Sequence, residues 1–144
     1  MDHEGTSSPH TNDSLAKHHE ALTGKIISAA LLVSNELGSG FLESVHQEAF
    51  LIAMRDHDLI VSPQVNMRVF FRGRLVGDFI ADYVVDSRIV VEIKATRCLV
   101  NEHVAQTINY LRASGHPIGL LFNFGQPRLE FKRVLNNPLA TQPK

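Results

Sequence analysis

A charged stretch within a run of strand-forming residues is the part of this sequence best suited to chemistry. The stretch "DFIADYVVDSRIVVEIKA" (residues 78–95) mixes branched and aromatic residues with charged ones: Asp78, Asp82, Asp86, Arg88, Glu92 and Lys94. A charge buried on a central strand costs several kcal/mol unless a partner compensates it. The acids and the lysine of such a strand therefore need either solvent or groups of opposite charge.

The relative placement of Asp82 and Glu92 depends on how the two strands of a predicted hairpin pair. Residues two apart in a strand share a face, so Glu92 and Lys94 point the same way. A three-residue loop over 86–88 places Asp82 directly opposite Glu92, whereas a two-residue loop places it opposite Val91. Only the first of these registers brings the two carboxylates side by side.

Two adjacent carboxylates repel each other and stay together when a cation lies between them. Their oxygen atoms suit Mg²⁺ or Mn²⁺. Lys94 could then hold a metal-bound water or help to deprotonate it, and the metal would stabilise the attacking oxygen and the charge that develops on a phosphate. The alternative is that Asp82 and Glu92 are solvated at a strand end, with Lys94 as their salt-bridge partner.

The spacing of apolar residues predicts the elements that position this stretch. Helical spacing covers three segments, 22–37, 41–58 and 101–115. Strand patterns cover five, 66–72, 76–85, 88–94, 117–125 and 128–135. Gly115 is a plausible C-terminal stop for the third helix. The resulting order, α α β β β α β β, predicts an α/β fold of the α+β sandwich type.

Length and composition indicate one globular domain. The chain has 144 residues, 44% hydrophobic and 20% charged, which suffice to bury a core. We expect a flexible polar tail over residues 1–14, a single domain over 15–135 and a C-terminal tail over 136–144.

Charge is divided unevenly along the chain. Residues 1–65 carry three Lys/Arg against nine acids, a net charge of −6, and residues 66–144 carry eleven against six, a net charge of +5. This division leaves room for a local basic face, although scattered solvated charge explains it equally well. Four arginines could line a phosphate-binding groove: Arg68, Arg72, Arg74 and Arg97. Solubility of a strand edge is the alternative role for the first three.

The sequence also indicates a compartment. Cys98 is the single cysteine, so no internal disulfide can form, which favours a reducing environment. The first fourteen residues lack the apolar core of a signal peptide, and no stretch approaches the ~18–20 apolar residues of a membrane span. We therefore expect a soluble cytoplasmic protein with no membrane partner.

Asp82 followed by "VEIK" resembles the motif of the PD-(D/E)XK nuclease superfamily. Within that superfamily, four ordered blocks are similar to the GxxExxY family: "ELGSGFLESVHQEAF" (36–50), "ADYVVDSRIVVEIKA" (81–95), "HVAQTINYL" (103–111) and "GLLFNFG" (119–125). The resemblance covers residues 22–134. It implies a restriction-endonuclease-like core, α-β-β-β-α-β, with an extra N-terminal helix.

The resemblance also implies a function and a site. The function is a Mg²⁺-dependent (or Mn²⁺-dependent) nuclease that hydrolyses nucleic-acid phosphodiester bonds, with DNA favoured over RNA as the partner. The implied metal ligands are Glu43, Asp82, Glu92 and the carbonyl of Ile93. Lys94 would position the nucleophilic water, supported by Gln106 and Tyr110. The alternative is a non-catalytic interaction module of the same fold, acting through a protein partner or a homodimer.

Several positions around this site carry separate expectations. His46 stands where the family has a tyrosine; its ring could still donate a hydrogen bond, but an imidazole in place of a phenol puts a chemical role for this position in doubt. Glu43 lies in the first turn of a helix, where the dipole already favours an acid. Asp78 is not the position that aligns with the catalytic acid, and Asp86 belongs to the turn.

The helix over 101–115 is expected to carry two distinct stripes. Gln106 and Tyr110 are four residues apart, so they share a helical face. The apolar residues of the helix form the other stripe, Val104, Ile108 and Leu111. If the apolar stripe packs on the sheet, the polar one should flank the strand ends that carry Glu92 and Lys94.

Overall fold

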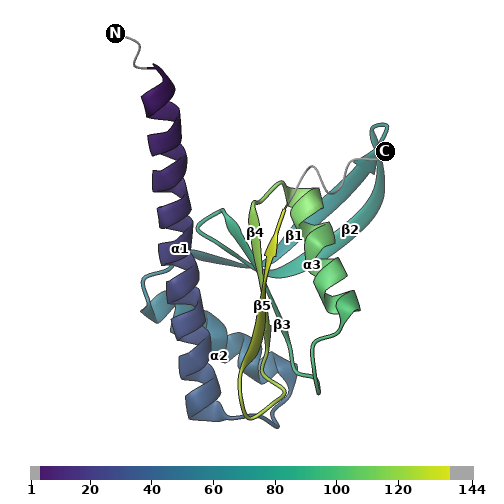
Figure 1. The fold of residues 1–144 in the computed structure, drawn as a ribbon. Coiled ribbons are helices and arrows are strands. Elements are labelled where there is room, and N and C mark those ends of the chain that lie inside the picture. The colour runs from purple at the N-terminus through teal and green to yellow at the C-terminus, as the bar shows by residue number, and fades with distance from the viewer. Residues whose placement is uncertain (1–3, 137–144) are drawn as a thin grey trace.

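Helices and strands follow one another in the predicted order. A computed structural model describes residues 4–136 of the chain, with side chains from residue 14 onward. The elements are α1 (Glu4–Leu37), α2 (Glu43–Asp56), β1 (Val61–Phe71), β2 (Arg74–Val85), β3 (Ile89–Lys94), α3 (Asn101–Ser114), β4 (Ile118–Asn123) and β5 (Glu130–Leu135) (Figure 1). The fold is therefore mixed α+β, and the predicted core α-β-β-β-α-β with an extra N-terminal helix is confirmed.

One five-stranded sheet runs in the order β1-β2-β3-β4-β5. The first three strands pair antiparallel, β3 and β4 pair parallel, and β5 returns antiparallel. A parallel pair needs a crossover connection, which α3 supplies. Because β4 lies inside the sheet with helices over both faces, all six of its residues are buried. The predicted buried strand in this part of the chain is confirmed.

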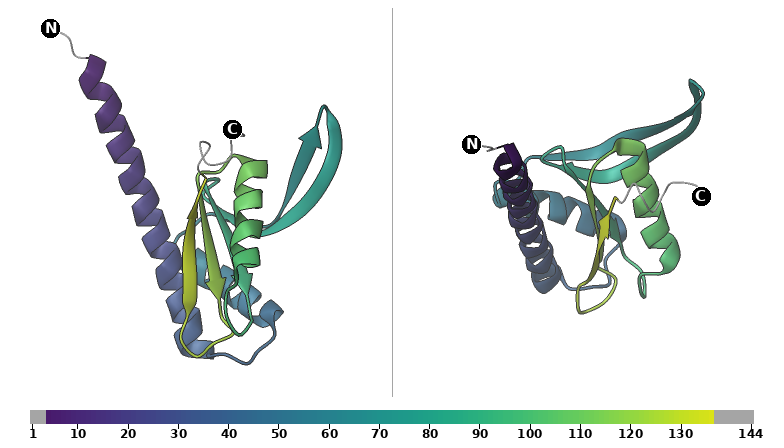
Figure 2. Two further views of the ribbon diagram at one scale, coloured as in Figure 1. Left: turned by 45° about the vertical axis from the view of Figure 1, so that its right-hand side comes forward. Right: turned by 45° about the horizontal axis from the view of Figure 1, so that its top comes forward.

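Helices cover the two faces of the sheet, α1 and α2 on one face and α3 on the other (Figures 1 and 2). On the first face, Phe50 of α2 packs edge-on against the rings of Tyr83 and Phe122, with ring centroids 5.6 and 5.3 Å apart. On the second face, Leu111 of α3 packs with Val90 and other apolar residues of the sheet. The polar atoms of the candidate site lie where the pairing of β2 with β3 ends, beside these two apolar layers.

Two elements are longer than predicted. Helix α1 begins at Glu4, so it takes in residues 4–14, which we expected to be a flexible tail. Once the packed part of a helix is formed, each further residue adds one hydrogen bond at low cost, so a polar segment can extend it. Strand β1 begins five residues before the predicted segment and contains Pro63. A proline is tolerated there because β1 is an edge strand.

The expected tails lie at the two ends of the chain. Residues 1–3 and 137–144 lie outside the described residues, and with them lie the first part of the expected N-terminal tail and nearly all of the C-terminal one. None of the helices within residues 4–136 is long and apolar enough to cross a membrane.

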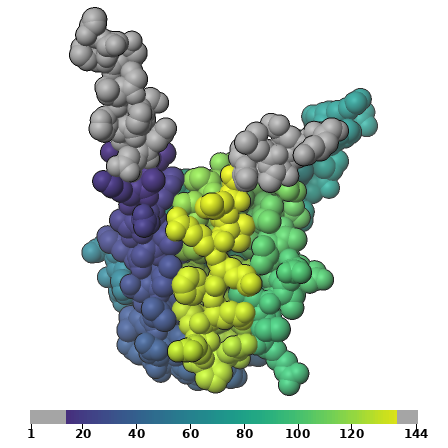
Figure 3. Space-filling view, in the orientation of Figure 1, coloured from purple at the N-terminus to yellow at the C-terminus, as the bar shows by residue number. Residues whose placement is uncertain are grey.

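The outer part of the β1–β2 hairpin leaves the sheet. Pairing of β2 with β3 ends at Tyr83 and Val91, whereas pairing of β1 with β2 continues to Phe71 and Arg74. Residues 68–80, here called the arm, therefore form a two-stranded ribbon that projects away from the rest of the sheet (Figures 2 and 3).

Candidate active site

The hairpin of β2 and β3 adopts the register that brings Asp82 and Glu92 together. Tyr83 pairs with Val91 around a three-residue loop, 86–88. The ladder ends there, and the next residues on the two strands are Asp82 and Glu92, which are joined through a side chain: the Asp82 N–H donates to the Glu92 carboxylate. The condition on which the sequence argument depended is thus met.

Each carboxylate bonds to the backbone of the opposite strand. The Asp82 N–H donates to Glu92 Oε2 at 2.6 Å, and the Ile93 N–H donates to Asp82 Oδ2 at 2.9 Å. Where the two strands begin to separate, these carboxylates thus accept the backbone N–H groups that backbone carbonyls would accept in a regular ladder. This exchange fixes both carboxyl groups at the edge between the sheet and the arm.

Burial makes these two acids electrostatically unusual. Glu92 is only 4% exposed. Burial first, and then the charge of Asp82, raises the pKa of Glu92 to about 8. Burial also raises the pKa of Asp82, against the opposing effect of the Ile93 N–H. Glu43 adds to both shifts and Lys94 opposes both. One lysine does not offset the pair, so the site either retains a proton or can take a further cation.

Helix α2 holds Asp82 through a residue that the sequence argument missed. The Gln47 Nε2 donates to Asp82 Oδ1 at 3.3 Å, and the Tyr83 hydroxyl donates to the Gln47 carbonyl at 2.5 Å. Gln47 follows Glu43 by four residues, so both lie on one face of the helix. That spacing was the signal that could have identified Gln47.

Glu43 is the first residue of α2 and its side chain is exposed. An acid at this position is favoured by the helix dipole, as expected. Within residues 14–136, no group of three or more His, Cys, Asp or Glu side chains is arranged to hold a metal ion. The structure therefore does not gather Glu43 with Asp82 and Glu92 into such a group, and the carboxylates of Asp82 and Glu92 each accept a backbone N–H instead.

A buried asparagine fixes the chain directly after Lys94. Asn123 Oδ1 accepts hydrogen bonds from the Thr96 and Gly125 N–H groups at 3.0 and 2.9 Å, and its Nδ2 donates to the Thr96 carbonyl and to Glu130 at 3.0 and 3.1 Å. Any Cβ at Gly125 would collide with the Thr96 backbone, so the approach requires glycine. In the sequence, Asn123 is part of the apolar segment 117–125, and nothing in that pattern indicates its role.

Tyr110 of α3 lies near the two acids. Its ring packs against Phe79 with centroids 5.7 Å apart. Burial first, and then the charges of Glu92 and Asp82, raises the pKa of Tyr110. The hydroxyl therefore stays protonated at neutral pH and can act only as a neutral donor or acceptor.

The expected separation of two stripes on α3 is wrong for Tyr110. Tyr110 is buried in the same apolar cluster as Leu111, and Thr107 between the stripes is also buried. Helix α3 lies on the sheet over a broader face than the predicted apolar stripe, because small and aromatic side chains fill the contact as well. Gln106 alone of the polar pair is exposed.

His46 has a structural setting. Its ring is fully buried and stacks on Phe124, with centroids 5.0 Å apart and planes 10° apart. Its Nε2 lies 2.8 Å from the Gly38 carbonyl. The ring thus ties the break between α1 and α2 to β4, which explains an aromatic side chain with a polar atom at this position.

The other two aspartates of the stretch lie elsewhere. Asp78 lies opposite Arg68 in the β1–β2 register of the arm, and its side chain is exposed. Asp86 lies in the loop between β2 and β3, with a carboxylate oxygen 3.5 Å from the His18 ring. As expected, only Asp82 joins Glu92.

A mixed sheet with helices on both faces and two acids on adjacent strands defines a nuclease-like class of fold. The chain matches the model of the PD-(D/E)XK nuclease superfamily over residues 20–134, and it belongs to that superfamily. No curated protein matches the chain. A solved structure titled "Crystal structure of SSO0001" is similar over 52% of this chain and 41% of its own length, with 20% identity and a TM-score of 0.45.

Proposed function

We propose that this protein is a nuclease that uses Mg²⁺ or Mn²⁺ to hydrolyse phosphodiester bonds of nucleic acid, with DNA preferred over RNA. The observation that carries the proposal is the buried Glu92 beside the half-buried Asp82, with an excess of negative charge between them. A fold alone would not require such a pair, because a buried charge without a partner is costly.

The donor groups suit a hard divalent cation. Carboxylate oxygens of Asp82 and Glu92 are the preferred ligands of Mg²⁺. The Ile93 N–H points toward β2, where it donates to Asp82. The next residue, Lys94, points the other way, because its carbonyl accepts a hydrogen bond from the Phe124 N–H, just after β4, at 2.8 Å. Since successive residues alternate in direction along a strand, the Ile93 carbonyl also points toward Asp82. These three residues would hold the ion, with Glu43 completing its surroundings through water.

The remaining residues would act on water and phosphate. A bound Mg²⁺ supplies charge stabilisation to the attacking and leaving oxygens of a phosphodiester. Lys94 would hold the attacking water and favour the loss of its proton. The Tyr110 hydroxyl would donate a hydrogen bond at the base of the site, and the exposed Gln106 would contact phosphate.

Cleavage assays with Lys94→Ala test this proposal. Single- and double-stranded DNA and RNA are incubated with the parent protein in Mg²⁺, in Mn²⁺ and in EDTA. We expect metal-dependent cleavage by the parent and its loss in Lys94→Ala. Lys132→Ala, which changes an exposed lysine of β5, should cleave like the parent. Equal rates in Lys94→Ala and the parent would contradict the proposed role.

Gln47→Ala should weaken binding of Mg²⁺ or Mn²⁺ by about 10–100-fold, the usual effect of removing a group that orients a ligand. The amide of Gln47 holds one oxygen of Asp82, and its loss frees that carboxylate to rotate. Calorimetric titration measures the affinity. Ser44→Ala, an exposed change on the same helix, is the control, and an unchanged affinity in Gln47→Ala would argue against this role.

The second candidate is a non-catalytic interaction module of the same fold. The observation in its favour is that Asp82 and Glu92 already accept backbone hydrogen bonds and form no three-acid cluster within the described side chains. Calorimetric titration of the folded parent separates the two candidates. Binding of Mg²⁺ or Mn²⁺ supports the nuclease, and no binding supports the module.

Three narrower proposals accompany the nuclease. The blocks around Gly40, Glu43 and the later helix support membership of the GxxExxY family, with His46 replacing the final tyrosine. A single exposed cysteine, Cys98, supports a cytoplasmic protein. We also propose that residues 15–135 form one domain.

A further inference from the structure

The arm carries large apolar side chains that the described chain covers only in part. Six of them are 39–63% exposed: Phe70, Phe71, Leu75, Val76, Phe79 and Ile80. Because neighbouring residues of a strand point to opposite faces, these side chains occupy both faces of the ribbon. An isolated two-stranded ribbon is marginally stable in water, and contiguous exposed apolar surface marks an interaction site. The arm therefore needs a partner surface.

An apolar groove lies between α1 and α2. It has a volume of about 220 Å³, and Leu32, Leu37 and Ile52 line it with 36–61% of their side chains exposed. Two exposed acids, Glu36 and Asp56, also line the groove. A large apolar side chain with a basic neighbour is the kind of group that such a groove accepts.

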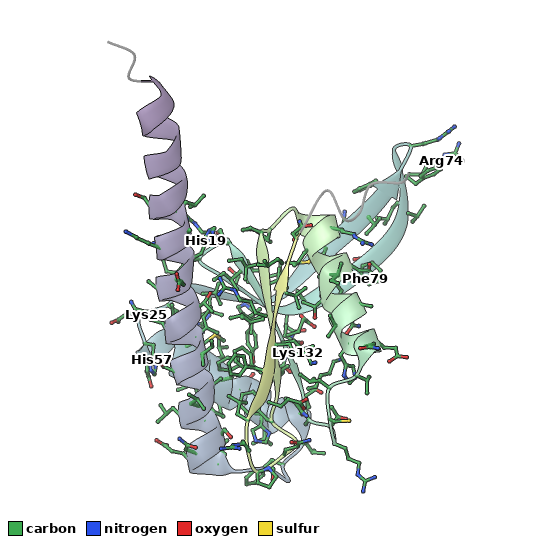
Figure 4. All side chains as sticks on the ribbon, in the orientation of Figure 1. His19, Lys25, His57, Arg74, Phe79 and Lys132 are labelled. Atoms are coloured by element: carbon green, nitrogen blue, oxygen red, sulfur yellow. The ribbon has the colours of Figure 1, made fainter. Side chains whose placement is uncertain are left out.

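The tip of the arm has that chemistry. Phe71 is 63% exposed, and the Arg72 guanidinium lies 5.4 Å from the centre of its ring. Arg74 lies at the outer end of the arm, directed away from the body (Figure 4). The arm bears three arginines against Asp78 alone, so it is basic where the groove is acidic. The same contrast divides the whole chain into halves of net charge −6 and +5.

One chain cannot join these two surfaces within itself. The arm and the lower ends of α1 and α2 lie at opposite ends of the molecule (Figure 1). We propose that the arm of one copy of this chain docks in the α1–α2 groove of a second copy. A reciprocal pair, in which each arm enters the groove of the other copy, uses both surfaces and closes without growing into a fibre.

Nucleic acid is the other class of partner for a basic ribbon, and the side chains favour a protein. Phosphates recognise the three arginines of the arm but give no reason for six exposed apolar residues on both of its faces. A groove lined by leucine and isoleucine recognises them directly. This inference is independent of the proposed catalytic activity.

Sedimentation equilibrium over a range of concentrations tests the pairing. We expect the parent to reach the mass of two chains. Phe71→Ser and Ile52→Ser should each raise the dissociation constant about 30-fold, the loss expected at a central apolar contact. Ile60→Ser removes a side chain that is 73% exposed outside both surfaces and should pair like the parent. A parent that stays a single chain up to its solubility limit would overturn the proposal.

A charge exchange identifies the two surfaces. One variant combines Arg72→Glu with Arg74→Glu, and the other combines Glu36→Lys with Asp56→Lys. Each alone should pair poorly, because both of its contacts set like charges together. Mixed in equal amounts, the two variants should pair again, since every arm then meets a groove of opposite charge. Failure of the mixture to pair, or arm variants that lose only nucleic-acid binding while keeping the parent's mass, would overturn the proposal.

Discussion

Glu92→Gln should abolish cleavage and yet make the metal-free protein more stable. Glu92 is a proposed metal ligand, and removal of one catalytic contact of this kind costs about 10²–10³-fold or more in rate. The same carboxyl group is buried beside Asp82, which raises its pKa from 4.5 to about 8. The uncharged amide of glutamine has nearly the same shape, so it removes the cost of burying a charge beside Asp82. Its oxygen can still accept the hydrogen bond from the Asp82 N–H.

The sign of the stability change follows from where the proton resides. Between pH 4.5 and about 8, the unfolded chain loses the Glu92 proton while the folded protein retains it. Deprotonation thus favours unfolding, and the free energy of unfolding of the parent falls as pH rises through this window. In EDTA, Glu92→Gln should match the parent near pH 4.5 and exceed it by about 2–4 kcal/mol at pH 8, at about 1.4 kcal/mol per pKa unit.

Urea denaturation at several pH values measures this difference. Added Mg²⁺ should stabilise the parent by about 2.7 kcal/mol at a hundred times its dissociation constant, and should leave Glu92→Gln unchanged. Glu102→Gln changes an exposed acid at the start of α3 and should remain within about 0.5 kcal/mol of the parent. A Glu92→Gln curve that runs parallel to the parent curve across the window would show that Glu92 titrates normally.

Asn123→Ala should lower the free energy of unfolding by about 3 kcal/mol or more. The change leaves several partly buried polar groups without these partners, chiefly the Thr96 and Gly125 N–H groups and the Thr96 carbonyl. Each buried group left unsatisfied costs about 1–3 kcal/mol. Because these bonds hold the chain just after Lys94, amide hydrogen exchange at Thr96 should also accelerate more than exchange in α1.

Asn109→Ala provides the matched control for this experiment. Asn109 lies on α3 with an exposed side chain, so its loss should change stability by no more than about 0.5 kcal/mol. If Asn123→Ala and Asn109→Ala unfold at the same urea concentration, the hydrogen bonds around Thr96 are not what holds the segment.

The sequence was sufficient to predict the order of helices and strands and to limit the pairing of the two acids to two registers. Alternation in residues 88–94 fixes which side chains share a face, but only the length of the loop, three residues in the structure, places Asp82 opposite Glu92 rather than Val91. Glu43 could be placed at a helix start for a similar reason, because "GSG" ends one helix and the apolar period resumes directly after it. Both predictions concern residues close together in the chain, whose relative positions follow from their spacing.

The contacts that the sequence did not predict join distant parts of the chain. Gln47 reaches Asp82 across 35 residues, and Asn123 reaches Thr96 across 27. The spacing from Glu43 indicates the helix face on which Gln47 lies, but neither contact can be predicted from spacing, since both depend on how α2 and β4 pack against β2 and β3. Tyr110 was misplaced for the same reason, because the width of the face that α3 buries is set by the sheet beneath it.

Two hydrogen bonds between carboxylates and backbone join β2 to β3 at the base of the arm, and both belong to residues of the candidate site. The Asp82 N–H and the Ile93 N–H are each held by a carboxylate rather than by a carbonyl. Any ligand that draws these carboxylates toward itself competes with the bonds that join the two strands at that point. We therefore expect metal binding at the proposed site to loosen the junction of β2 and β3 at the base of the arm.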